Sequence, residues 1–118
     1  MNKFTCIYYL TESDRPPVEE FIRALNLRTR QKFFSVVSLL EEFGKQLLEP
    51  HAKYIGDDIY ELRFRGQEGH IRILYFFYHQ NTIVLANGFI KKTNKVPSKE
   101  KQLAIQRRQA YLIRTKER

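Results

Sequence analysis

The stretch 59–95 constrains the fold of this chain most strongly, because the character of its side chains alternates from one residue to the next. In its first segment the charged side chains are Glu61, Arg63 and Arg65, and the apolar ones between them are Tyr60, Leu62 and Phe64. Successive side chains of a strand point to opposite faces of a sheet, so this pattern predicts a half-buried strand. Two further apolar segments follow, separated by short polar turns. The stretch therefore predicts an antiparallel meander of three strands.

The expected register of the first hairpin brings two arginines together. If residues 66–69 form the turn, the opposed pairs are Arg65 and His70, Arg63 and Arg72, and Glu61 and Leu74. Like charges that are directly opposed destabilise a sheet, so this face is expected to hold an anion. A loop at Gln80-Asn81 would add Phe89 and Lys91 to the same face, opposite Arg72 and His70.

The rest of the chain predicts an α+β domain. A strand over 4–10 is expected to be buried on both sides, and Pro17 is suited to the first position of a helix. Thr29 is a candidate cap for a second helix, whose inward side chains would be Phe33, Val36, Val37, Leu40 and Phe43, and Gly44 is expected to end it. Residues 47–58 are expected to be a connector, and 99–114 a last helix. The predicted order is β-α-α-β-β-β-α in one domain, 1–118, with helices packed on one face of a mostly antiparallel sheet.

The net charge of +8 is concentrated in one half of the sequence. Residues 1–58 hold 8 Lys and Arg and 9 Asp and Glu, a net of −1, whereas residues 59–118 hold 13 and 4, a net of +9. A basic half suggests binding to nucleic acid or to a strongly acidic protein, while a solvated basic surface without a ligand is the simpler alternative.

Several chemistries lack support in the sequence. It has no P-loop, no dinucleotide-binding glycine pattern and no Cys/His pairs at zinc spacing, so no cofactor and no metal is expected. The single Cys6 is expected to be a buried structural thiol. No apolar segment is long enough to span a bilayer, which favours a cytoplasmic protein without membrane contact. The three histidines, of which only His70 falls on the charged face, are expected to have surface or loop roles.

The basic set on the charged face is the main functional candidate. Arg63 and Arg72 can bind phosphate in a bidentate manner, and Phe89 beside them offers a stacking surface for an unpaired base. Glu61 has two interpretations: it neutralises the crowded arginines, or it acts as a general base. The predicted RNA-binding residues around this core are Lys53, Arg65, Phe89, Lys91, Lys95, Arg107 and Tyr111.

These residues carry a resemblance to a known family. The segments are PVEEFI at 17–22, LLEP and HAKYIGDDIYELRF within 47–64, HIRILYFF at 70–77 and GFIKKTNKVP at 88–97, with Ala104, Arg107 and Tyr111 in the last helix. In these segments the chain resembles the RelE/HigB superfamily of toxins from type II toxin–antitoxin systems, in particular its phage-derived branch. The resemblance implies a compact microbial-RNase-like fold. It also implies a metal-independent endoribonuclease that cuts mRNA on the ribosome and is silenced by a cognate antitoxin, typically a helix-turn-helix protein.

The resemblance also implies roles for single residues. The basic functional positions of the family fall on Arg63, Arg72 and Lys92, with Lys91 adjacent, and its C-terminal aromatic position falls on Tyr111. The chain departs from the family pattern at two positions. Glu61 stands where some relatives have lysine, and Asn87 stands where phage-type relatives often have histidine. A candidate proton-transfer group is therefore missing, and two alternatives remain open: a non-catalytic inhibitor similar to ParE, or an RNA-binding module.

Overall fold

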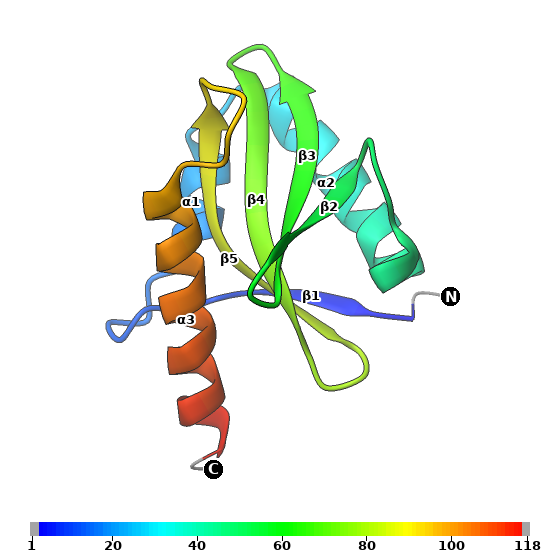
Figure 1. Cartoon of the computed structure of the whole chain (residues 1–118). Coiled ribbons are helices and arrows are strands. Elements are labelled where there is room, and N and C mark those ends of the chain that lie inside the picture. Colours follow the sequence, from blue (N-terminus) through cyan, green and yellow to red (C-terminus); the bar gives the residue numbers. More distant parts are fainter. Residues whose placement is uncertain (1–2, 117–118) are drawn as a thin grey trace.

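A five-stranded sheet forms the centre of the structure, a computed structural model that describes residues 3–116. Its strands are β1 (Thr5–Tyr8), β2 (Ala52–Gly56), β3 (Ile59–Gly66), β4 (Gly69–Tyr78) and β5 (Thr82–Lys91). They lie in the order β1-β5-β4-β3-β2 (Figure 1). Only β1 runs parallel to its neighbour, and the other pairs are antiparallel. The α+β class and the mostly antiparallel sheet are thus confirmed.

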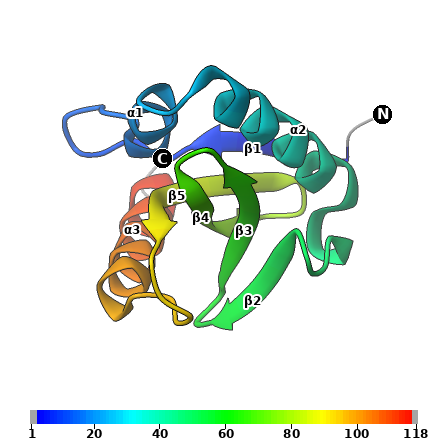
Figure 2. The same ribbon diagram turned by 90° about the horizontal axis from the view of Figure 1, so that it is seen from above.

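Three helices cover the sheet. The sequence analysis predicted all helices on one face, but in the structure they lie on both faces (Figure 2). The helices are α1 (Pro17–Arg23), α2 (Leu27–Phe43) and α3 (Ser98–Lys116), and a short 3-10 turn, η1 (Gly44–Gln46), follows α2. Figure 2 shows α1 and α2 on one side of the sheet and α3 on the other. Leu74 and Phe76 explain the difference, because they lie on the face predicted to be charged and pack beneath Ala104 of α3. Burial of these apolar side chains beneath α3 removes them from water, which stabilises the fold.

The connector predicted for residues 47–58 contains a strand that the sequence analysis missed. β2 pairs with β3 and adds a fourth strand after α2. It is an edge strand in which only Ala52 is buried, so it lacks the alternation by which a half-buried strand is recognised. β1 was also predicted inaccurately: it is shorter than 4–10 and none of its four residues is fully buried, because it lies at the opposite edge. Burial and the nearby Glu41 raise the pKa of the Cys6 thiol to about 12, which suits a structural thiol.

The helix boundaries confirm some of the predicted signals and correct others. Pro17 begins α1 as expected. Asn26, not Thr29, caps α2, because its side chain accepts a hydrogen bond from the Arg28 amide at 2.9 Å, while Thr29 is buried inside the helix. Phe43 is 43% exposed and does not belong to the buried face. Gly44 follows with a φ of 55°, and a Cβ atom there would clash with the ring of Phe4.

The pairing of strand residues around the two arginines is as predicted. For β5 it is reached through a bulge that the sequence did not predict. Arg63 pairs with Arg72, and Arg72 pairs with Phe89. At the far end of the hairpin Tyr78 pairs with Thr82, one residue away from the expected partner, and a bulge at Ala86 restores the register. The bulge changes which side chains face α3, because even-numbered residues such as Val84 do so before it and odd-numbered residues after it.

Candidate anion-binding site

A buried carboxylate lies between the two opposed arginines. Glu61 has no exposed surface, and its Oε1 atom accepts a hydrogen bond from Arg63 Nε at 2.6 Å. The same oxygen lies 3.7 Å from Arg72 Nε. Arg63 and Glu61 are two residues apart on β3 and so project from the same face, and Arg72 reaches them from β4. The repulsion expected between the arginines is therefore offset by an acidic group beneath them.

The cluster keeps an excess of positive charge. Two guanidinium groups share one carboxylate, and their side chains are 21% and 11% exposed for Arg63 and Arg72. Burial lowers the pKa of Arg72, the Glu61 carboxylate opposes that shift, and Arg63 adds to it. An arginine guanidinium is not deprotonated in proteins. Arg72 Nε and Glu61 Oε2 are buried and have no hydrogen-bond partner among the described residues, so the hydrogen bonding inside the cluster is incomplete.

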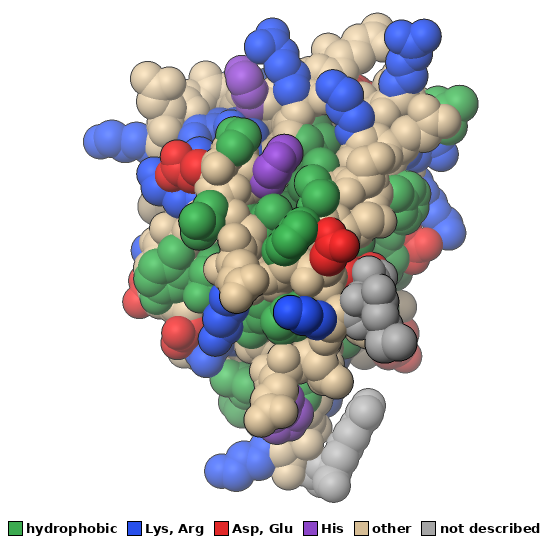
Figure 3. Space-filling model, turned by 90° about the vertical axis from the view of Figure 1, so that its right-hand side faces the viewer, with side chains coloured by type: hydrophobic (Ala, Val, Ile, Leu, Met, Phe, Trp, Pro, Cys, Tyr) green, Lys and Arg blue, Asp and Glu red, His purple; other side chains and the backbone are tan. Residues whose placement is uncertain are grey.

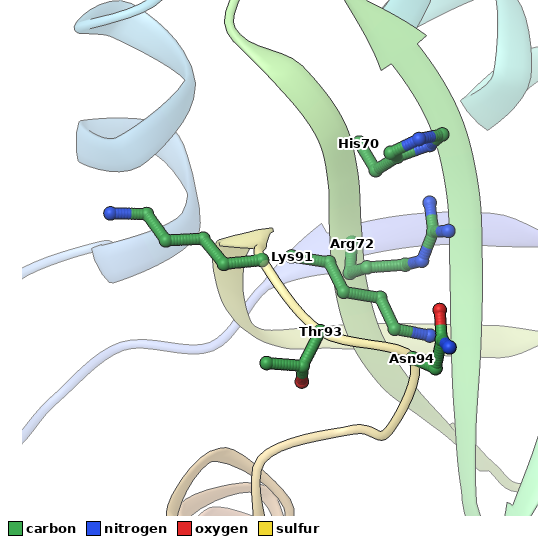
Figure 4. Close-up of a pocket in the computed structure, with 6 residues that line it drawn as sticks. His70, Arg72, Lys91, Thr93 and Asn94 are labelled. Atoms are coloured by element: carbon green, nitrogen blue, oxygen red, sulfur yellow. The ribbon is translucent and has the colours of Figure 1, made fainter.

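Next to this cluster lies a basic pocket with a volume of about 270 Å³. It is lined by His70 and Arg72 from β4, Lys91 from β5, and Lys92, Thr93 and Asn94 from the loop after β5. We call it the basic pocket below. His70 and Lys91 are Cα partners across the two strands. Figure 4 shows the side chains of His70 and Arg72 projecting in the same direction from β4, with Asn94 below them.

Three lining residues, His70, Thr93 and Asn94, were not among the predicted site residues. For His70 a signal was present, because the predicted register already placed it on the charged face opposite Lys91. Thr93 and Asn94 lie in a loop whose path the sequence pattern does not determine. Gly88, earlier on β5, allows α1 to pack closely against this strand. A Cβ atom at this position would lie only 2.6 Å from the Phe21 ring of α1.

The structure brings Arg63, Arg72, Lys91 and Lys92 together but separates them from other predicted RNA-binding residues. Arg107 donates a hydrogen bond to the Ala86 carbonyl at 2.8 Å and lies over the Tyr9 ring, so it supports the bulge. Burial lowers the pKa of Arg107. Tyr111 packs against Phe76 and Tyr78, at the end of β4 remote from Arg72.

The remaining predicted residues do not line the basic pocket. Phe89 is only 8% exposed and presents little of its ring for stacking on a base. Lys53 is exposed on β2 opposite Glu61, and Lys95 is exposed in the loop after β5. Arg65 lies beside His70 at the hairpin turn.

Asn87 occupies a buried position on β5, and Leu74 of β4 lies between it and Glu61 of β3. Its side-chain amide donates to the Glu100 carbonyl at 3.2 Å and to Glu100 Oε1 at 3.0 Å, which ties β5 to the first turn of α3. Its Oδ1 atom is buried without a hydrogen-bond partner among the described residues. An amide does not act as an acid or base at neutral pH, so Asn87 supplies no proton-transfer group.

Residues 3–116 contain no cluster of three or more His, Cys, Asp or Glu side chains that could hold a metal ion. Within the same range no helix is long and apolar enough to cross a membrane.

The fold and this site define a class: a small α+β domain in which opposed arginines and neighbouring lysines form a basic cluster beside a pocket. The family follows from the sequence, because residues 20–109 match the model of the phage-derived protein Gp49-like family (DUF891). The chain belongs to this family, a toxin-like family of toxin–antitoxin systems. Membership implies an antitoxin partner. No curated protein shows a significant match to the sequence.

Proposed function

We propose that this protein is the toxin of a type II toxin–antitoxin system and inhibits translation as a metal-independent endoribonuclease that cleaves mRNA on the ribosome. This places it with the RelE/HigB toxins. The observation that carries the proposal is the pair of guanidinium groups held around Glu61 at the edge of a pocket that also contains two lysines. Such a group of fixed cations suits a phosphodiester whose negative charge increases in the transition state.

The proposed reaction uses the ribose next to the cleaved bond as the nucleophile. The 2′-oxygen forms a bond to phosphorus as its proton passes to a base. The bond from phosphorus to the 5′-oxygen breaks, and that oxygen receives a proton. The products are a 2′,3′-cyclic phosphate and a 5′-hydroxyl end. No redox partner is needed, and the protein must orient the strand, stabilise charge and move two protons.

We assign the phosphate contacts to Arg63 and Arg72. Lys92 protonates the leaving oxygen or stabilises its charge. We assign Glu61 a positioning role in place of the general base, because its carboxylate has no exposed surface that a substrate hydroxyl could reach. His70 is the better candidate for the base, since its exposed imidazole lines the pocket beside Arg72.

We expect cleavage to depend on the ribosome because the basic pocket has few groups that can transfer protons. The pocket contains one imidazole and no carboxylate. Precise placement of the 2′-hydroxyl in line with the leaving oxygen can supply a large part of a rate enhancement, and an external scaffold such as the ribosome can provide that placement. Free RNA should therefore be cut slowly.

The experiment is to map the 5′ ends of cellular mRNA shortly after induction of the protein, with Arg72→Ala as the inactive variant and Arg15→Ala as a control of equal charge change on an exposed side chain. New 5′-hydroxyl ends within coding regions are expected for the wild type and the control only. Growth arrest without such ends would overturn the nuclease assignment.

A non-catalytic function is the second candidate, either as an inhibitor similar to ParE or as an RNA-binding module. The buried carboxylate of Glu61 and the amide of Asn87 favour it, because neither can serve a substrate as a proton acceptor. An open reading frame for a small helix-turn-helix protein beside the gene would support the toxin role in both cases, and the map of mRNA ends separates them.

A further inference from the structure

A second basic hollow lies on the other side of the β3–β4 hairpin turn. It has a volume of about 460 Å³ and is lined by residues of α2 and of the turn: Asn26, Arg28, Thr29, Lys32, Arg65, Gly66 and Gln67. Three of these carry positive charge and none is acidic. Within residues 3–116, Arg28, Lys32 and Arg65 form no salt bridge, although Lys32 Nζ donates to the Arg65 carbonyl at 2.9 Å.

The two basic hollows adjoin at one pair of residues. Arg65 lines the second hollow and His70 lines the basic pocket, and these two residues are Cα partners across the hairpin. Directly opposed residues in an antiparallel pair lie only about 5 Å apart. The hollows together form one basic surface across the end of the hairpin, to which Arg28, Lys32 and Arg65 contribute on one side and Arg72, Lys91 and Lys92 on the other.

The nearest acidic side chain is already engaged. The Glu68 carboxylate accepts hydrogen bonds from the Asn26 amide at 2.5 Å and from the Thr29 hydroxyl at 2.6 Å. These bonds, chiefly the one from the Asn26 amide, lower the pKa of Glu68. Glu68 thereby connects the hairpin turn to the start of α2 through the backbone amide of Asn26 and the hydroxyl of Thr29. The cations of the second hollow remain available for a ligand.

Two of the other hollows contain an acidic side chain, whereas the one lined by Phe4, Phe43 and Phe77 contains Lys3 and Lys45 and no acidic side chain. The hollow between α3 and the loop before α1 contains Glu12, and the one near Tyr60 contains Asp58. In Figure 3 the Lys and Arg side chains gather over the upper part of the molecule, where Figure 1 places the β3–β4 turn, and fewer lie over the lower part.

We infer that the second hollow binds the phosphodiester backbone of the single-stranded RNA whose cleaved bond lies in the basic pocket. The strand would cross the hairpin turn at Arg65 and His70 and place flanking phosphates against Arg28 and Lys32. This inference rests on the proposed RNA substrate and extends it to a second binding region, which the sequence did not indicate because residues 1–58 have a net charge of −1. The contacts are to phosphates, so they add affinity for long strands without sequence preference.

Binding of RNA that cannot be cleaved tests the inference independently of catalysis. The probes are fully 2′-O-methylated strands of two and of ten nucleotides, with fluorescence anisotropy measured at several salt concentrations. The test variant carries Arg28→Gln and Lys32→Gln. The control variant carries Arg15→Gln and Lys116→Gln, two exposed side chains remote from the hairpin turn, and thus has the same net charge. Melting temperatures confirm that both variants are folded.

The test variant should bind the longer strand more weakly and the shorter strand as the wild type does. Two lost phosphate contacts should flatten the dependence of log affinity on log salt by about 1.4 for the longer strand. The control variant should match the wild type with both probes. Equal losses in test and control variants, or no loss in either, would overturn the inference. If Arg72→Ala weakens both probes while the test variant weakens neither, the basic pocket stands and the second hollow is excluded. Absence of binding by the wild type would contradict both.

Discussion

Glu61 Oε1 lies 2.6 Å from Arg63 Nε, two residues further along the same strand, and it has no exposed surface. The oxygen also lies 3.7 Å from Arg72 Nε on the neighbouring strand. This arrangement explains how two arginines can be directly opposed in a sheet without forcing the strands apart. A carboxylate lies between the two guanidinium groups, of which that of Arg72 lines the basic pocket, and the cluster keeps an excess of one positive charge.

Glu61→Gln should destabilise the protein, because two partly buried arginines would then lack a counter-charge. Breaking one partner of a buried ion pair typically costs about 3 kcal/mol or more, and the partial exposure of both arginines favours the lower end of that range. The free energy of unfolding in urea is the measurement, and Glu42→Gln on the exposed side of α2 is the matched control. A loss below about 0.5 kcal/mol, the range of ordinary surface changes, would contradict the counter-charge role.

Arg72→Lys should be much less toxic than the wild type when expressed. Lysine keeps the charge but cannot make the two parallel hydrogen bonds of a guanidinium to a phosphate. Growth rate after induction is the measurement, with Arg15→Lys as the control and the amount of folded protein checked in each strain. Full toxicity of Arg72→Lys would mean that charge alone is sufficient at this position.

Cleavage should continue after transition metals are removed. The protein and ribosomes are treated with a chelator, magnesium is restored for the ribosomes, and cleavage of a short mRNA is followed. In the proposed mechanism guanidinium and ammonium groups stabilise the charge that metal ions stabilise in metal-dependent nucleases. Recovery of activity only after zinc or manganese is added to the toxin would refute that mechanism.

The antitoxin should bind at a rate that falls as the salt concentration rises. Residues 59–118 carry a net charge of +9, so an acidic segment of the antitoxin would be attracted to this half of the chain. Stopped-flow mixing with the antitoxin encoded beside the gene measures the association rate at several ionic strengths. The dissociation rate should change little. An association rate independent of salt would show that the antitoxin binds through another surface.

The Glu68→Gln variant should lose less stability than the wild type when the pH is lowered. Hydrogen bonds from Asn26 and Thr29 hold the pKa of Glu68 below its ordinary value of 4.5. A carboxylate with a lowered pKa contributes stability above its unfolded pKa, and that contribution is lost as the pH falls through its folded pKa. Below about pH 4.5 the wild type should therefore lose stability more steeply than the variant. Melting temperatures between pH 7 and pH 3 test this, and parallel curves would exclude the effect.

The sequence alone determined the strands that carry the site and the register between β3 and β4. Period-two alternation identifies which side chains share a face, and a four-residue turn leaves little freedom in pairing, so Arg63 opposite Arg72 could be predicted. The first-turn proline of α1 and the glycine after α2 were reliable for a similar reason, since both act through local backbone geometry.

Only the tertiary structure decided how these parts are covered and what surrounds the arginines. β2 was missed because an edge strand buries little and shows no clear pattern. The position of α3 depended on apolar residues further along the face that was predicted to be charged. The pairing of β4 with β5 near their turn differs by one residue from the prediction, and the bulge at Ala86, which no local signal indicated, restores the predicted pairing at Arg72. Arg107 and Tyr111 were predicted to bind RNA, but they pack against Tyr9, Phe76 and Tyr78. Charge and spacing in a sequence show which residues are available. Burial decides which of them serve the fold and which remain free to meet a ligand.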